Sequence, residues 1–208
     1  MDADAIELRV LGCLLEKQRT TPDQYPLTLN ALRLACNQST NRDPIVDYDE
    51  REIHDALQRL ARRGWTRVAS GPGSRAAKYR QLFDQELGLE RDATAILCVL
   101  MLRGAQTPGE LKQRTERLHR FADIGDVLGT LDGLIARELV ERLDRRPGQK
   151  EERYQHLLGS VDVEHTVSPT HTVPAASADE SLERRVDELE TEVERLREAV
   201  RALEARLD

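Results

Sequence analysis

The stretch DEREIHDALQRLARRGWTRVASGPGSRAAKYRQLF, residues 49–83, decides the fold that the sequence predicts. Its first part places apolar residues at helical spacing, at Ile53, Leu57 and Leu60. Gly64 is suited to end that helix, because glycine adopts the left-handed conformation of a helix C-terminus without steric cost. Two extended runs, residues 65–69 and 76–83, then flank SGPGSR, whose glycine and proline content is typical of a hairpin loop. The stretch therefore predicts a helix followed by a β-hairpin.

Two further helices are predicted before this stretch, over residues 6–17 and 29–36, where leucines recur at helical spacing. Residues with capping chemistry precede all three helices: Asp4 with Glu7, Thr28, and Asp47 with Glu50. In the second half of the chain, Thr107 with Glu110 has the same chemistry and marks a further helix start. Three helices followed by a two-stranded hairpin is the element order of a winged helix-turn-helix domain.

The same pattern recurs in the second half of the chain. Apolar residues of the first helix reappear 86 positions later, those of the third helix 74 later, and the hairpin residues 75 later. Tyr79 thus corresponds to Tyr154, and the shorter offset indicates a deletion in the loop after the second helix. Core and turn positions that align together indicate a true repeat. We therefore expect a mainly α protein with small β-wings, made of tandem winged helix-turn-helix domains at 1–85 and 86–160.

The tail differs from both domains. Residues 161–181 are rich in Ser, Thr, Pro and Ala, which predicts a flexible linker. Over residues 182–208, apolar residues alternate steps of four and three, as in a coiled-coil helix: Leu182, Val186, Leu189, Val193, Leu196, Val200, Leu203 and Leu207. Val at one seam position and Leu at the other favours a parallel two-stranded coil, so we expect a homodimer. A solvated single helix, or one folded back on the body, would carry the same pattern.

Charge distribution narrows the possible functions. The chain has 31 basic and 38 acidic residues, and the net charge of −7 lies in residues 161–208, since residues 1–160 sum to zero. This balance excludes a strongly basic module that binds nucleic acid by bulk charge. The longest apolar run, residues 96–102, is far below the roughly 20 residues that a membrane span needs. We expect a cytoplasmic protein without membrane contact.

Motifs for catalysis are missing from the sequence. It contains no HExxH, no phosphate loop and no GxSxG, and its five histidines lack metal-ligand spacing. The three cysteines lie among aliphatic residues, which is typical of buried reduced thiols. We expect no enzymatic activity, no catalytic residues, no metal and no cofactor.

The two hairpins hold the residues that we expect to contact nucleic acid: Arg67, Arg75, Lys78 and Arg80 in the first, and Arg145, Arg146 and Lys150 in the second. Basic hairpins can reach phosphates or the minor groove. Exposed hairpin tips are also basic for solubility and to protect sheet edges. The third helix, normally the groove reader, begins with acidic residues, at Asp49, Glu50, Glu52 and Asp55. Those acids disfavour phosphate contact, and they equally suit the helix dipole.

Three stretches carry a family resemblance: RVLGCLLEKQRTTPDQYPLTLNALRLACNQSTNRDP from Arg9, RGAQTPGELKQRTERLHRF from Arg103, and RPGQKEERYQHLL from Arg146. Over about residues 5–160 the chain strongly resembles the YceH-like family of bacterial proteins. The resemblance implies a tandem winged-helix fold, in agreement with the repeat, and it carries over no catalytic residue.

The most distinctive part of the resemblance is a polar loop over residues 37–44. Its candidates for ligand contact are Asn37, Thr40, Asn41 and Arg42. The same side chains are suited to satisfy the backbone of the loop itself. Similar proteins often have Lys where this chain has Ser39, so the loop is less basic here.

A stripe of glycines marks the third helix of the second domain. Gly125, Gly129 and Gly133 recur every four residues, on the side opposite Val127 and Leu131. Glycine costs up to about 1 kcal/mol relative to Ala inside a helix, so the stripe suggests close approach of a protein partner. Neutral substitutions to glycine, tolerated because the apolar face holds the helix in place, would leave the same pattern.

The sequence is compatible with two functions. The leading hypothesis is a DNA-binding protein that serves as a transcription regulator. In this hypothesis a coiled-coil dimer presents paired winged helices to a duplex. The alternative is a scaffold whose winged helices bind partner proteins without DNA. The basic hairpins favour the first, and the zero net charge of residues 1–160 favours the second.

Overall fold

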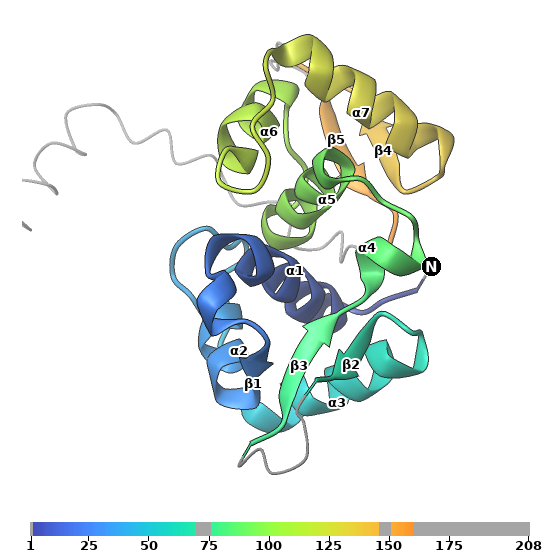
Figure 1. Cartoon of the computed structure of the whole chain (residues 1–208). Coiled ribbons are helices and arrows are strands. Elements are labelled where there is room, and N and C mark those ends of the chain that lie inside the picture. Colours follow the sequence, from blue (N-terminus) through green and yellow to red (C-terminus); the bar gives the residue numbers. More distant parts are fainter. Residues whose placement is uncertain (1, 70–75, 146–150, 160–208) are drawn as a thin grey trace, which may run out of the picture. The chain divides into compact units, whose positions relative to one another are not determined.

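The computed structural model describes residues 2–69, 76–145 and 151–159. These belong to one compact unit, residues 1–161. The first half of the compact unit contains α1 (Ala5–Thr20), a 3₁₀ turn (Pro22–Gln24), β1 (Leu27–Thr28), α2 (Leu29–Cys36), α3 (Glu50–Arg62), β2 (Thr66–Val68) and β3 (Lys78–Gln81). The short α4 (Phe83–Glu86) leads into the second half, which contains α5 (Arg91–Arg103), α6 (Pro108–Thr115), α7 (Ile124–Ala136), β4 (Val140–Leu143) and β5 (Arg153–His156). Figure 1 shows this order of elements. The structure is thus mainly helical, with small antiparallel sheets.

Helix starts agree with the sequence at three of the four predicted caps. The Asp4 and Glu7 pair forms a capping box, Thr28 caps α2 by accepting from the Ala31 N–H, and Thr107 begins α6.

The predicted cap of the third helix is wrong by two residues. The capping box is Asp49 with Glu52, and not Asp47 with Glu50. The Asn37 side chain explains the shift, because it accepts from the Tyr48 N–H and donates to the Tyr48 carbonyl at 2.8 Å. These bonds hold the chain outside the helix as far as Tyr48.

The first sheet has the strand order β1-β3-β2, and both pairings are antiparallel. Thr66 pairs with Gln81, and both are buried on the core face. Arg67 pairs with Arg80 on the opposite face. Because side chains alternate along a strand, Lys78 lies on that outer face with Arg80. We call Arg67, Lys78 and Arg80 the basic sheet face.

The second half repeats the order of the first. An isolated bridge between Gln106 and Tyr154 stands where β1 pairs with β3, and β4 pairs with β5 as β2 does with β3. Residues 70–75 and 146–150, which include both predicted hairpin loops, lie outside the described residues.

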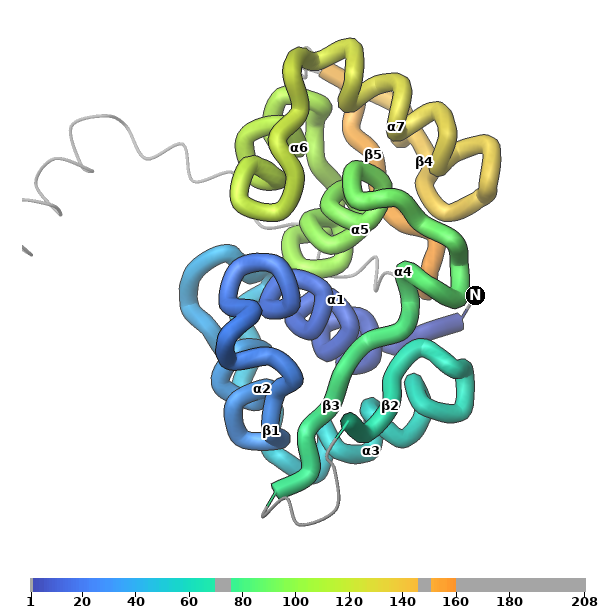
Figure 2. Tube along the Cα trace, viewed as in Figure 1, coloured from blue at the N-terminus to red at the C-terminus, as the bar shows by residue number. Residues whose placement is uncertain are grey.

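The two halves meet along α1 and α5 (Figures 1 and 2). Every α5 residue from Thr94 to Leu102 is buried, as expected for a helix that is apolar on nearly every side. Gly12 permits the close approach, since a Cβ there would lie 2.8 Å from Leu102 Cδ2. The Asp43 N–H also donates to the Leu102 carbonyl at 2.9 Å, so the loop after α2 touches the second half.

The described cysteines, Cys13, Cys36 and Cys98, are buried and free, as predicted. None of the described helices has the length and apolarity that a membrane span requires.

Candidate nucleic-acid interface

The basic sheet face places three cations on one small surface. Arg67 and Arg80 lie directly opposite each other on neighbouring strands, with Cβ atoms about 5 Å apart in such pairs. Lys78 is two residues from Arg80 and pairs with Thr28 of β1. Like charges that face each other across strands are destabilising, so an anion at this position would relieve the repulsion.

No carboxylate of the described chain forms an ion pair with Arg67, Lys78 or Arg80. Arg67 and Lys78 are exposed, and Arg80 is half-buried. The Arg80 Nε atom is covered and has no hydrogen-bond partner among the residues that the structure describes. A covered donor without a partner is uncommon in proteins. The face therefore retains its positive charge.

The second hairpin differs in its charge balance. Arg145 forms an ion pair with Glu152 at 3.6 Å, and Arg142 contacts the same carboxylate at 3.5 Å. Arg153 bonds Glu110 at 3.0 Å. Arg146 and Lys150 lie outside the described residues, as does Arg75 of the first hairpin. Free positive charge in the described part of the hairpins is thus concentrated on the first.

The acidic start of α3 is exposed. Glu52 bonds the Asp49 N–H, Glu50 lies 4.0 Å from Arg33, and Asp55 is exposed. Two basic residues near the end of α3 are already engaged, since Arg59 and Arg63 pair with Asp4 and Glu7 of the α1 capping box. Insertion of α3 into a DNA groove would bring uncompensated carboxylates towards phosphates.

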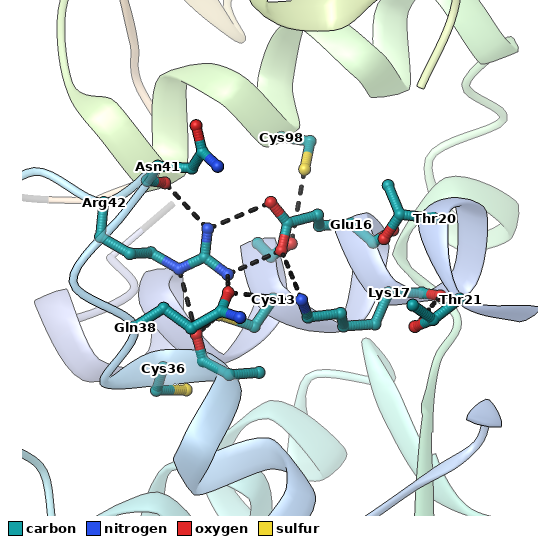
Figure 3. A network of polar contacts seen from close by, with 12 residues as sticks. Cys13, Glu16, Lys17, Thr20, Thr21, Cys36, Gln38, Asn41, Arg42 and Cys98 are labelled. Carbon is teal, nitrogen blue, oxygen red and sulfur yellow. Dashed lines mark hydrogen bonds and ion pairs between the residues drawn. The ribbon is translucent and has the colours of Figure 1, made fainter. Parts of the chain in front are cut away.

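The polar loop after α2 serves the interior. Arg42 is buried, and its five N–H groups donate to Glu16, Gln38 Oε1 and the carbonyls of Ala35 and Asn41 (Figure 3). The closest of these contacts, between Arg42 Nη2 and Glu16 Oε2, is 2.6 Å. The Arg42 side chain therefore has no donor left for a ligand.

Electrostatics support this structural role. Burial alone would raise the pKa of Glu16, but the hydrogen bond and positive charge of Arg42 hold that pKa below its ordinary value. Burial opposes the charge of Arg42 as well, yet the Glu16 contact raises the pKa of Arg42. The pair remains ionised in the folded protein.

The other loop candidates divide between interior and surface. Asn37 is engaged with Asp47 and the backbone of Tyr48. Asn41 has φ of 60° and accepts a hydrogen bond from Arg103 of α5. Thr40 is exposed. Asn37 and Arg42 therefore hold the first half together, and Asn41 links it to the second.

The glycines of α7 face outward, as their spacing predicts. A Cβ added at Gly129 or Gly133 would meet nothing within 4 Å. Ile124 and Leu128 lie beside the stripe and remain 41% and 37% exposed. We call this surface, with the three glycines, Ile124 and Leu128, the α7 face.

No group of three or more potential metal ligands occurs among the described residues. The eight seam residues from Leu182 to Leu207 lie outside them.

Comparison with known proteins places the chain in a family. Residues 3–149 match the family described as "Protein of unknown function, DUF480". The chain belongs to this family. It is 48% identical to a UPF0502 protein of Enterobacter sp. (strain 638) over 98% of this chain and 96% of that protein. It is also 45% identical to the UPF0502 protein YceH of Salmonella typhimurium, with the same coverage of both chains. The resemblance seen in the sequence is thereby confirmed.

Three features of this DUF480 protein were missed by sequence reasoning. The sequence contains no direct sign that Arg67 faces Arg80, because register depends on the length of the hairpin loop. The ion pairs of Arg142 and Arg145 with Glu152 can be recognised only after the two strands are aligned. Ile124 and Leu128 could have been found, because they are four residues apart and lie to one side of the inward face.

Proposed function

We propose that this protein binds double-stranded DNA through the first of two winged helix-turn-helix halves. In this proposal it acts in the cytoplasm as a transcription regulator. The observation that carries the proposal is the basic sheet face, where Arg67 opposes Arg80 beside Lys78 without a carboxylate partner in the described chain. Cations on exposed strands suit phosphate contact.

The element order supports the winged-helix assignment. In each half a helix is followed by a short strand or bridge, two helices and an antiparallel pair of strands. In helix-turn-helix proteins the last helix and its flanking hairpin lie near the duplex. In the proposed winged helix, β2 and β3 form the wing.

Dimerisation would double the contact with DNA. Eight apolar seam positions over residues 182–207 would expose a continuous stripe if the helix stood alone. Pairing of two chains along a parallel coiled coil buries that stripe.

An anisotropy titration with a labelled duplex tests the proposal. The full chain should bind at low salt, and Arg67→Ala with Lys78→Ala and Arg80→Ala should weaken the affinity. Arg142→Ala with Arg145→Ala is a matched control, because these cations are paired with Glu152. Absence of duplex binding by the full chain at low salt would reject the proposal.

The α7 face favours a second candidate function, the docking of a protein partner. The helix contains two acids, Asp126 and Asp132, and no basic residue between Ile124 and Ala136. DNA is therefore an unsuitable ligand for this face. The fitting partner is an amphipathic helix whose small apolar face packs on the glycines and whose Lys or Arg residues face Asp126 and Asp132.

Replacing Gly129 and Gly133 by Ala separates docking from simple tolerance. Both positions have room for the methyl group, so thermal stability should rise in either case. Docking predicts that self-association or the binding of a purified partner is lost, while Gly109→Ala on α6, which also has room, leaves it intact. Unchanged association in the double variant would exclude the docking role.

A further inference from the structure

We infer that the basic sheet face anchors a duplex by its phosphates and does not read the base sequence. The inference rests on the proposed function and names the part of DNA that this site recognises.

The chemistry of the face is that of a phosphate site. Its outward residues are Arg67, Lys78 and Arg80, together with Thr28 of β1. The Thr28 hydroxyl already accepts from the Ala31 N–H at 3.3 Å, where it caps α2. Base reading in the major groove uses an Asn or Gln amide on adenine, or an Arg or Lys on guanine. The outer face of the described strands holds no amide, so guanine is the base that its cations could read, and the duplex panel of the test therefore varies in guanine content.

The geometry also suits an anion better than a base edge. Arg67 and Arg80 lie opposite each other in the register of β2 and β3, so two like charges share one small surface. A phosphate that bridges both guanidinium groups removes the repulsion between them, whereas the edge of a neutral base compensates it only weakly.

The helices that would normally read the groove are poorly suited to it. The exposed face of α3 carries Glu50, Glu52 and Asp55. Its arginines Arg51 and Arg62 are exposed and have no ion pair within the described part of the chain. The equivalent helix of the second half, α7, carries acids only. Deep entry of either helix into a groove therefore meets repulsion from phosphates on both sides.

The test compares unrelated duplexes in an anisotropy titration with the full chain. We use duplexes of about 20 base pairs that differ in sequence and composition, and we repeat each titration over a range of salt concentrations. Wild-type affinities should agree within about threefold across the panel. The slope of log K against log salt should fall by about 0.9 for each of Arg67, Lys78 and Arg80 that is replaced by Ala, equally on every duplex.

Two control variants distinguish the possible outcomes. Arg142→Ala with Arg145→Ala removes the same kind of charge from the second hairpin and should leave the slope unchanged. Arg51→Ala with Gln58→Ala alters exposed α3 residues and should leave the relative affinities of the duplexes unchanged.

Contrary results separate this inference from the proposed function. A preference of tenfold or more for one duplex that disappears in the α3 variant would overturn the inference and leave DNA binding intact. An equal loss of slope in the second-hairpin variant would also overturn it, since binding would then follow overall charge. Failure of the wild-type chain to bind any duplex would reject the proposed function itself.

Discussion

Replacement of Arg42 by Met tests whether the loop after α2 is a structural element. The Arg42 side chain has no exposed surface, and all five of its N–H groups are bonded. Methionine preserves much of the volume and leaves Glu16 as a largely buried carboxylate without its main partner. Removal of one member of a buried ion pair costs about 3–5 kcal/mol. We therefore expect the free energy of unfolding to fall by about 4 kcal/mol.

Equilibrium unfolding in urea measures this loss. With a slope of about 2 kcal/mol per M, typical of a small protein, the midpoint should shift by about 2 M. Arg42→Lys should lose roughly 2–3 kcal/mol, because lysine retains the charge but supplies at most three of the five donors. The double variant Glu16→Leu with Arg42→Met should be more stable than Arg42→Met alone, since it leaves no unpaired carboxylate.

The pH dependence provides an independent check. In the wild type the folded pKa of Glu16 lies below its ordinary value of 4.5, so the stabilisation by the pair is complete above that pH and is lost as the pH falls through the folded pKa. In Arg42→Met, burial should raise the pKa of Glu16, and the acid form is tolerated in the interior. The cost of the substitution should therefore shrink on acidification from pH 7 to pH 4.

The opposite results would refute this reasoning. A loss below about 1 kcal/mol, or a loss that does not change with pH, would show that Arg42 does not hold Glu16 in the folded state. A ligand-binding role for the loop predicts instead that the urea midpoint is unchanged and that only ligand affinity falls.

Three further predictions follow from other parts of the chain. Burial lowers the pKa of His156 to about 4, so at pH 5 only the unfolded chain takes the proton. The free energy of unfolding should therefore fall by about 2 kcal/mol from pH 7 to pH 5. The same fall in His156→Phe would contradict this assignment. Gly129→Ala and Gly133→Ala should each raise the free energy of unfolding by up to about 1 kcal/mol. A lower melting temperature of either variant in calorimetry would contradict the outward exposure of these positions. Light scattering should show a dimer for the full chain and a monomer for a chain ending at Ala175, and equal oligomeric states would reject the coil as the dimerising element.

Local sequence signals predicted the helices well. Caps at Asp4, Thr28 and Thr107 were correct because a cap depends on residues three positions apart, and these are visible in the sequence. The burial of α5 was also predictable, since its apolar residues leave no polar side. The error at Asp47 arose from a contact across ten residues, between Asn37 and the chain before α3. A spacing rule contains no information about such a contact.

The candidate site was harder to predict, because charge in a sequence does not reveal which partner each charge has. Arg42 and Arg67 look equally basic along the chain. The fold directs Arg42 towards Glu16 in the interior and leaves Arg67 outside, opposite a second arginine. Sequence reasoning placed the candidate binding residues on the two hairpins, but only strand alignment distinguishes an unpaired cation from one paired across the sheet.

The unequal chemistry of the two halves argues against two identical roles. Among the described residues, the first half carries cations without an ion pair on its sheet, whereas Arg142 and Arg145 of the second half pair with Glu152. The second half also exposes an apolar, glycine-rich α7. Because α1 and α5 pack closely and the Arg42 loop contacts both halves, an object bound to one half is held in a fixed orientation to the other. In the proposed function, a backbone anchor on the first half would leave the choice of DNA site to another protein, and we propose the α7 face as the surface that binds it. The unequal chemistry of the halves thus favours the proposal of an adaptor that holds a protein on DNA over that of a reader with two equivalent wings.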